Sequence, residues 1–71
     1  MKTERLVAMA NDIAAFFDAE TDKAVAAQNV ASHLKRFWDP RMRRELAEHL
    51  RDGGEGLSDL SRAGVALLER S

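Results

Sequence analysis

The sequence predicts an all-α fold, a small bundle of three to four short helices that forms a single domain over residues 1–71. Apolar residues recur at alternating spacings of three and four, which is typical of helices with one buried face. Residues that favour helix starts precede these stretches, and no stretch shows the alternation of a strand. The chain has no cysteine, and twelve of its apolar residues are alanine, so the core is small and a partner would help to stabilise it.

The first helix is expected over residues 3–19, with Thr3 as its capping residue and Glu4 near the positive end of the helix dipole. Its apolar stripe consists of Leu6, Met9, Ile13 and Phe16, flanked by Val7, Ala10, Ala14 and Phe17. The stripe is wide enough to cover one side of a bundle.

The second helix is expected to begin at Thr21 or Asp22 and to end near Phe37. Its stripe consists of Ala27, Val30, Leu34 and Phe37, which predicts that Phe37 belongs to the core. Lys35 and Arg36 fall in the last turn, where cations complement the exposed carbonyl groups.

The third helix is expected to start at the pair Asp39-Pro40. Asp39 can accept hydrogen bonds from the first turn, and proline lacks an N–H group that would be unpaired there anyway. Its narrow apolar stripe consists of Met42, Leu46 and Leu50. Gly53 is expected to end this helix in a left-handed conformation.

A fourth, short helix is expected after the turn GGEG, with Ser58 and Asp59 at its start. Its apolar residues are Leu60, Val65, Leu67 and Leu68. Gly64 lies inside it and costs about 1 kcal/mol relative to alanine, which indicates close packing against another segment.

The residue pattern argues against catalysis, cofactor binding and metal binding by this chain. The two histidines do not form an i, i+4 pair; His33 is interpreted as a partly buried, hydrogen-bonded residue and His49 as a surface or last-turn residue. The serines fit helix surfaces and caps better than an activated nucleophile. The GGEG turn lacks the Lys-Ser/Thr of a phosphate-binding loop, and Glu55 would repel an anion there.

The stretch HLKRFWDPRMRR, residues 33–44, combines five cations with two aromatic residues and allows three interpretations. Nucleic acid could bind through phosphate contacts and base stacking. Alternatively, the aromatic residues belong to the core and Glu45 and Glu48 neutralise much of the arginine charge. In the third interpretation, an exposed Trp38 and the arginines anchor a protein interface, because Trp and Arg are enriched at binding hot spots.

Net charge and hydropathy indicate where the protein acts. A net charge of −1 provides no overall field that would attract nucleic acid or an anionic membrane. There is no apolar run of signal-peptide or membrane-span length, so we expect a cytoplasmic protein without a membrane partner.

Three segments, LVAMANDIAAFF, VASHLKRFWDPRMRRELAEHL and GGEGLSDLSRAGVALL, together resemble a known family. In this order and spacing they are similar to the delta subunit of the soluble NAD-dependent, molybdenum-containing formate dehydrogenases of bacteria. The resemblance extends from Leu6 to Leu68, and its most specific parts are HLKRFWDPRMR and GGEGLS.

The resemblance implies a non-catalytic accessory subunit with a role in complex stability, assembly or maturation of the molybdenum cofactor. In that family the bis-molybdopterin guanine dinucleotide, the iron–sulfur clusters, the FMN and the NAD site belong to other subunits. The expected partner is the catalytic alpha subunit.

We expect this chain to dock on the alpha subunit through the edge where its second and third helices meet. Glu55 and the glycine turn are expected to lie beside this edge. Its expected residues are Phe37, Trp38, Pro40, Arg41, Met42, Arg43 and Arg44. A regulatory module that binds protein or nucleic acid through the same Trp/Arg corner is the alternative, and a homodimer stays open.

Overall fold

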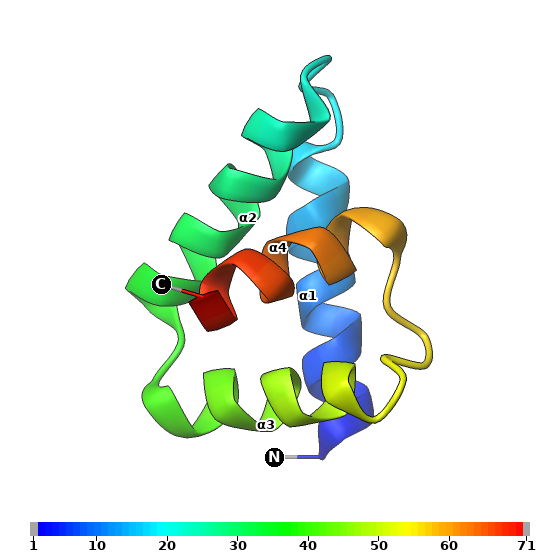
Figure 1. The fold of residues 1–71 in the computed structure, drawn as a ribbon, viewed down its shortest axis with the longest axis vertical. Coiled ribbons are helices and arrows are strands. Elements are labelled where there is room, and N and C mark those ends of the chain that lie inside the picture. Colours follow the sequence, from blue (N-terminus) through cyan, green and yellow to red (C-terminus); the bar gives the residue numbers. More distant parts are fainter. Residues whose placement is uncertain (1, 71) are drawn as a thin grey trace.

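The computed structural model describes residues 2–70, which form four helices: α1 (Thr3–Phe17), α2 (Lys23–Phe37), α3 (Pro40–Arg51) and α4 (Asp59–Arg70). The predicted all-α fold is confirmed. Figure 1 shows that α1 and α2 meet at their connection and diverge away from it, that α3 crosses the open end, and that α4 lies over the front. The most extensive helix contact is between α2 and α4. None of the helices within residues 2–70 is long and apolar enough to cross a membrane.

Two aspartates start helices as predicted. The Oδ1 atom of Asp22 accepts a hydrogen bond from the amide of Ala24 at 3.0 Å. The Oδ1 atom of Asp39 accepts one from the amide of Met42 at 2.8 Å, and Pro40 is the first residue of α3. Each side chain thereby pairs an amide that lacks a partner within the first turn.

The prediction that Thr3 caps α1 is wrong. The N-cap residue is Lys2, which makes no capping hydrogen bond through its side chain, and Thr3 is already helical. The Thr3 hydroxyl instead donates a hydrogen bond to Oε2 of Glu45 at 2.7 Å. A contact with α3 has replaced the local cap, and α1 ends at Phe17, two residues earlier than expected.

The end of α3 confirms the role expected of Gly53. This residue has a φ of +117°, and Gly54 has a φ of +64°. The Gly53 amide donates to the carbonyl of Leu50 at 3.1 Å, and the Gly54 amide donates to the carbonyl of His49 at 2.8 Å. These two bonds form a Schellman motif, which pairs the last carbonyl groups of the helix.

Every helix contributes to one core. Its buried members are Leu6, Ala10 and Ala14 of α1, Val30 and Leu34 of α2, Leu46 of α3, Val65 of α4, and Trp38 and Leu57 from the connections. Leu6, Val30, Leu34, Leu46 and Val65 have no exposed surface. Many buried positions are alanine, so the helices must approach closely to exclude water.

The exposures of Phe37 and Trp38 are the reverse of those predicted from the sequence. Trp38 is 6% exposed and belongs to the core, whereas Phe37 is 68% exposed. Trp38 leaves the helical conformation, with φ −95° and ψ 142°, while its amide still bonds the carbonyl of Leu34. Phe37 lies in the last turn of α2, where α1 has diverged and no longer covers the stripe (Figure 1).

We predict that Trp38→Ala lowers the free energy of unfolding by about 3–5 kcal/mol, because it empties a large part of a small core. Phe37→Ala, at the neighbouring exposed position, should lower it by less than about 1 kcal/mol. Urea unfolding followed by circular dichroism measures both values. Equal losses in the two variants would contradict the burial assignment.

Gly64 provides the close approach of α4 to α2, as expected from its position inside a helix. A Cβ atom at Gly64 would lie 2.5 Å from Cγ1 and 2.7 Å from Cβ of Val30, and 3.5 Å from the carbonyl oxygen of Ala27. The absence of a side chain therefore allows these two helices to pack without separating.

We predict that Gly64→Ala destabilises the protein by about 1–3 kcal/mol, although alanine is the better helix former. In a Val30→Ala background the added methyl group has room, so the same substitution should cost much less. A double-mutant cycle of unfolding free energies measures this coupling. Additive effects would show that the contact does not limit the helix spacing.

Candidate protein-docking surface

Charge is strongly segregated along this chain. Residues 33–44 carry five cations and one carboxylate, a net charge of +4, and the remaining residues carry a net charge of −5. The five cations, Lys35, Arg36, Arg41, Arg43 and Arg44, lie at the end of α2 and the start of α3 and are called the basic corner below. The weak overall charge of the protein thus conceals a local cationic surface.

The neutralisation expected from Glu45 and Glu48 does not occur at the basic corner. Glu45 accepts the hydrogen bond from Thr3. Within residues 2–70 the ion pairs are Lys23 with Asp18 at 3.0 Å, and Arg51 with Glu69 at 2.6 Å. Neither pair involves a residue of the basic corner, so the cations there are available for an external anion.

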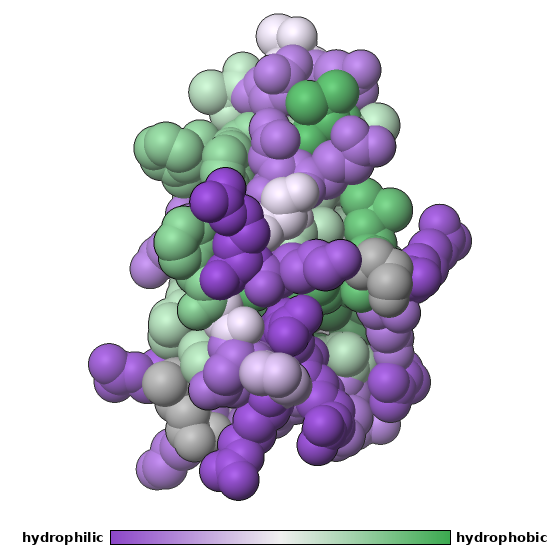
Figure 2. Space-filling view, turned by 90° about the vertical axis from the view of Figure 1, so that its left-hand side faces the viewer, coloured by the Kyte–Doolittle hydropathy of each residue, from purple (hydrophilic) through white to green (hydrophobic). Residues whose placement is uncertain are grey.

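Phe37 is an exposed aromatic side chain directly beside these cations. Its ring centroid lies 4.7 Å from that of His33 and 5.7 Å from the guanidinium carbon of Arg36. Figure 2 shows hydrophilic side chains crowding the lower half of this side of the molecule and apolar ones gathered along its upper left. An exposed aromatic residue flanked by arginine is typical of an interface anchor.

His33 continues the aromatic contacts toward α1. Its ring centroid lies 6.1 Å from that of Phe17, which packs edge-on against Phe16 at 5.1 Å. His33 is half-buried, as expected, but among residues 2–70 its ring contacts two aromatic neighbours and makes none of the side-chain hydrogen bonds that were also expected. Phe16 is 78% exposed, so apolar surface is exposed at both ends of this aromatic row.

A groove of about 350 Å³ runs along the length of α3, from Pro40 to Arg51, beside the last turns of α2 and α4. Its polar lining consists of Lys35, Arg43, Arg44, Arg51 and Glu69. The Nε atom of Arg43, one of these lining residues, is buried and has no hydrogen-bond partner among the described residues. An unpaired buried donor costs about 1–3 kcal/mol, so the Arg43 side chain would gain from an acceptor.

The other predicted docking residues do not all lie together. Pro40, Arg41 and Arg44 are exposed at the start of α3, while Met42 is half-buried against the core. Glu55 is exposed but lies in the α3–α4 connection, at the opposite end of α3 from the basic corner (Figure 1). The glycine turn and the basic corner are therefore separated by the length of α3, and the expectation that both belong to one docking edge stays a prediction.

Comparison with known proteins identifies the family. A model of the family described as NADH-dependent formate dehydrogenase delta subunit, FdsD, matches residues 5–65. The chain belongs to this family. No curated protein and no solved structure matches it significantly.

Membership of this delta-subunit family confirms the resemblance noted in the sequence and implies partner subunits, because the family is named as one component of a formate dehydrogenase. The matched residues include the whole basic corner and Phe37. Within residues 2–70, no group of three or more His, Cys, Asp or Glu side chains is arranged to hold a metal ion.

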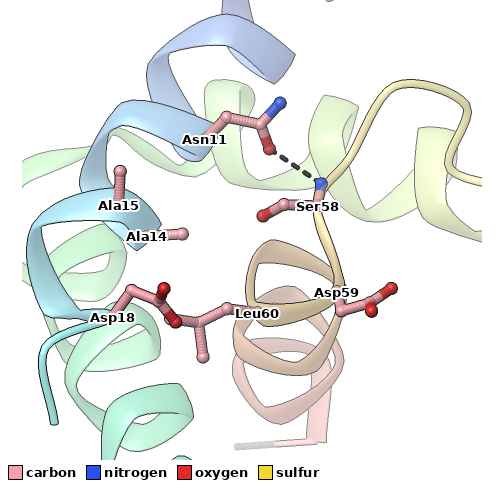
Figure 3. Close-up of a pocket in the computed structure, with 7 residues that line it drawn as sticks. All are labelled: Asn11, Ala14, Ala15, Asp18, Ser58, Asp59 and Leu60. Carbon is pink, nitrogen blue, oxygen red and sulfur yellow. Dashed lines mark hydrogen bonds between the residues drawn. The ribbon is translucent and has the colours of Figure 1, made fainter.

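Asn11 has a structural role in this delta-subunit chain that the sequence analysis missed. Its Oδ1 atom accepts hydrogen bonds from the Ser58 amide at 3.0 Å and from the Ser61 hydroxyl at 2.8 Å, and its Nδ2 donates to the carbonyl of Gly56 at 2.8 Å. Figure 3 shows Asn11 extending from α1 toward Ser58 at the start of α4. A polar residue within an apolar stretch was the only sequence signal for this role.

Arg62 of α4 forms hydrogen bonds with the glycine turn. Its guanidinium donates to the carbonyl oxygens of Gly53 at 3.0 Å, Gly54 at 2.9 Å and Leu57 at 3.3 Å. The Nε2 atom of His49 lies 2.8 Å from the Glu55 carbonyl oxygen. The GGEG turn therefore has all these carbonyl groups engaged and acts as a structural connection.

We predict that Asn11→Ala lowers the free energy of unfolding by about 1–3 kcal/mol and increases amide exchange at Ser58, because two hydrogen bonds to the start of α4 and one to the glycine turn are lost. Asn11→Asp should recover part of the stability, because a carboxylate still accepts from Ser58 and Ser61. Hydrogen exchange and urea unfolding measure the two effects. A neutral Asn11→Ala variant would contradict the assigned role.

Proposed function

We propose that this chain is a non-catalytic accessory subunit of a soluble, cytoplasmic NAD-dependent molybdenum formate dehydrogenase, and that it docks on the catalytic alpha subunit. The family match over residues 5–65 carries the proposal. In this proposal the molybdenum cofactor, the iron–sulfur clusters, the FMN and the NAD belong to the partner subunits. The delta-subunit chain supports complex stability, assembly or maturation of the molybdenum centre.

The docking anchor in this proposal consists of Phe37 at the end of α2 and of Arg41 and Arg44 at the start of α3. Phe37 is 68% exposed, and both arginines are exposed and outside the ion pairs of residues 2–70. Burial of an exposed aromatic ring excludes water from apolar surface, and arginine contributes directional hydrogen bonds. In this proposal Trp38 stabilises the docking surface indirectly. Its buried side chain fixes the connection between α2 and α3, and Phe37 and Pro40 are exposed on either side of that connection.

We predict that Phe37→Ala combined with Arg41→Ala reduces recovery of the alpha subunit with the tagged delta-subunit chain by at least about tenfold, as expected for loss of a hot-spot pair. Co-purification from cells that express the complete dehydrogenase measures recovery, and circular dichroism verifies that the variant is folded. Formate-dependent NAD reduction by the recovered complex, followed over time at raised temperature, reports whether the chain stabilises the enzyme.

Phe16→Ala is the matched control, because Phe16 is also exposed but belongs to the end of α1. It should leave recovery of the alpha subunit unchanged. Unchanged recovery with the Phe37/Arg41 variant, or a loss with Phe16→Ala alone, would show that the docking surface lies elsewhere. Recovery of a different subunit without the alpha subunit would exclude the proposed partner.

The uncompensated basic corner also favours one alternative, a regulatory module that binds nucleic acid. Such a module predicts retention on DNA or RNA at about 50 mM salt that falls steeply as salt is raised. The net charge of −5 on the rest of the chain opposes contact with an extended polyanion.

A homodimer is the other alternative. Self-association through Phe16 and Phe37 would be detected as a dimer by light scattering.

A further inference from the structure

We infer that the groove between α3 and the last turns of α2 and α4 is a receptor for aspartate or glutamate side chains of the subunit on which this chain docks. The inference rests on the proposed function and adds the chemistry of the partner surface. Lys35, Arg43 and Arg44 contribute three of its cations, and Arg51, at the end of the same helix as the two other arginines, contributes the fourth.

The charges in the groove leave room for external carboxylates. Four cations and one carboxylate line it, and the carboxylate of Glu69 is already paired with Arg51 at 2.6 Å. Lys35, Arg43 and Arg44 form no ion pair with any residue in the described part of the chain. Three like charges around one hollow repel each other, and an anion between them removes that repulsion.

The unpaired guanidinium donor of Arg43 favours a carboxylate as the ligand. Its Nε atom is buried without an acceptor in the free chain. A guanidinium binds a carboxylate through two parallel hydrogen bonds, and one common arrangement uses Nε together with a terminal nitrogen. A small rotation of the Arg43 side chain toward a carboxylate in the groove would therefore pair a donor that is otherwise unsatisfied.

The shape of the groove favours a protein segment over a nucleic acid or a membrane. Pro40, Ala47 and Leu68 also line it, so aliphatic side chains of a peptide have surface to contact. Its volume of about 350 Å³ suits a few side chains. A nucleic acid or an anionic membrane would extend beyond the groove. It would then be repelled by the carboxylates that give the rest of the chain its net charge of −5.

The groove and the docking anchor meet at the corner where α2 ends and α3 begins. Phe37 lies in the last turn of α2, two residues after the groove residue Lys35, and Pro40 belongs both to the groove and to the start of α3. A partner that covers both must extend around the end of α2, from the Phe37 face to the Lys35 face. The partner surface that fits is an apolar patch with at least one carboxylate beside it.

Charge reversal tests the inference. The purified dehydrogenase complex lacking this chain is titrated with the wild-type chain and with the Arg43→Glu/Arg44→Glu variant by isothermal calorimetry at about 50 mM and 300 mM salt. We expect the variant to bind on the order of 100-fold more weakly and with less salt dependence, because like charges now face each other. The control Lys2→Glu/Arg5→Glu makes the same charge change outside the groove and should alter affinity by less than about threefold.

A second measurement uses the wild-type chain and does not depend on the variant folding. The chain has three lysines, Lys2, Lys23 and Lys35, and only Lys35 lies in the groove. A carbodiimide joins an amine and a carboxylate that are in contact as an amide, without adding atoms between them. We expect mass spectrometry of the treated complex to find Lys35 joined to an aspartate or glutamate of the partner.

The outcomes separate this inference from the proposed function. Wild-type affinity in the charge-reversal variant, or a complex that forms without any product at Lys35, overturns the inference. It also removes Arg44 from the docking anchor, but it leaves docking through Phe37 and Arg41 intact. No binding of the wild-type chain to the dehydrogenase overturns both. Retention of the wild-type chain on DNA at about 50 mM salt, lost in the same variant, assigns the groove to nucleic acid and also overturns the inference.

Discussion

Gly64 allows α4 to lie directly against Val30 of α2, and the rest of the structure depends on this close contact. A chain with twelve alanines has few large side chains with which to separate and fill its layers. Its helices must therefore approach closely to bury a continuous core. The contact between α2 and α4 is the most extensive in the fold, and it sets where the other two helices can pack.

The position of α2 against α4 also explains the exposed corner. α1 diverges from α2, and α3 crosses the open end between them (Figure 1). Trp38, directly after α2, is buried in the core. Phe37 is left outside as a consequence, beside arginines that no carboxylate of residues 2–70 neutralises. One packing requirement thus stabilises the fold and creates a surface suited to a partner.

The two ends of α3 have different roles. At its end the chain is tied down by the Schellman motif, by Arg62 and by Asn11, which together engage the carbonyl and amide groups of the glycine turn. At its start the polar groups are turned outward, and the Nε atom of Arg43 is left without an acceptor. Among the described residues, the unpaired buried donor therefore lies near the start of α3, where the docking surface is proposed.

The sequence by itself determined the helices, their order and several of their ends. Asp22, Asp39 with Pro40, and Gly53 act through bonds within a few residues, so local chemistry was sufficient to predict them. The family could also be recognised, because its specific segments are continuous in the sequence. Only the tertiary structure decided which of Phe37 and Trp38 is buried, that Thr3 bonds Glu45, and that Glu55 lies far from the basic corner. These three features depend on how helices that are distant in the sequence cross. Helical periodicity shows which residues share a face, but it does not show where along the helix a neighbouring helix stops covering that face.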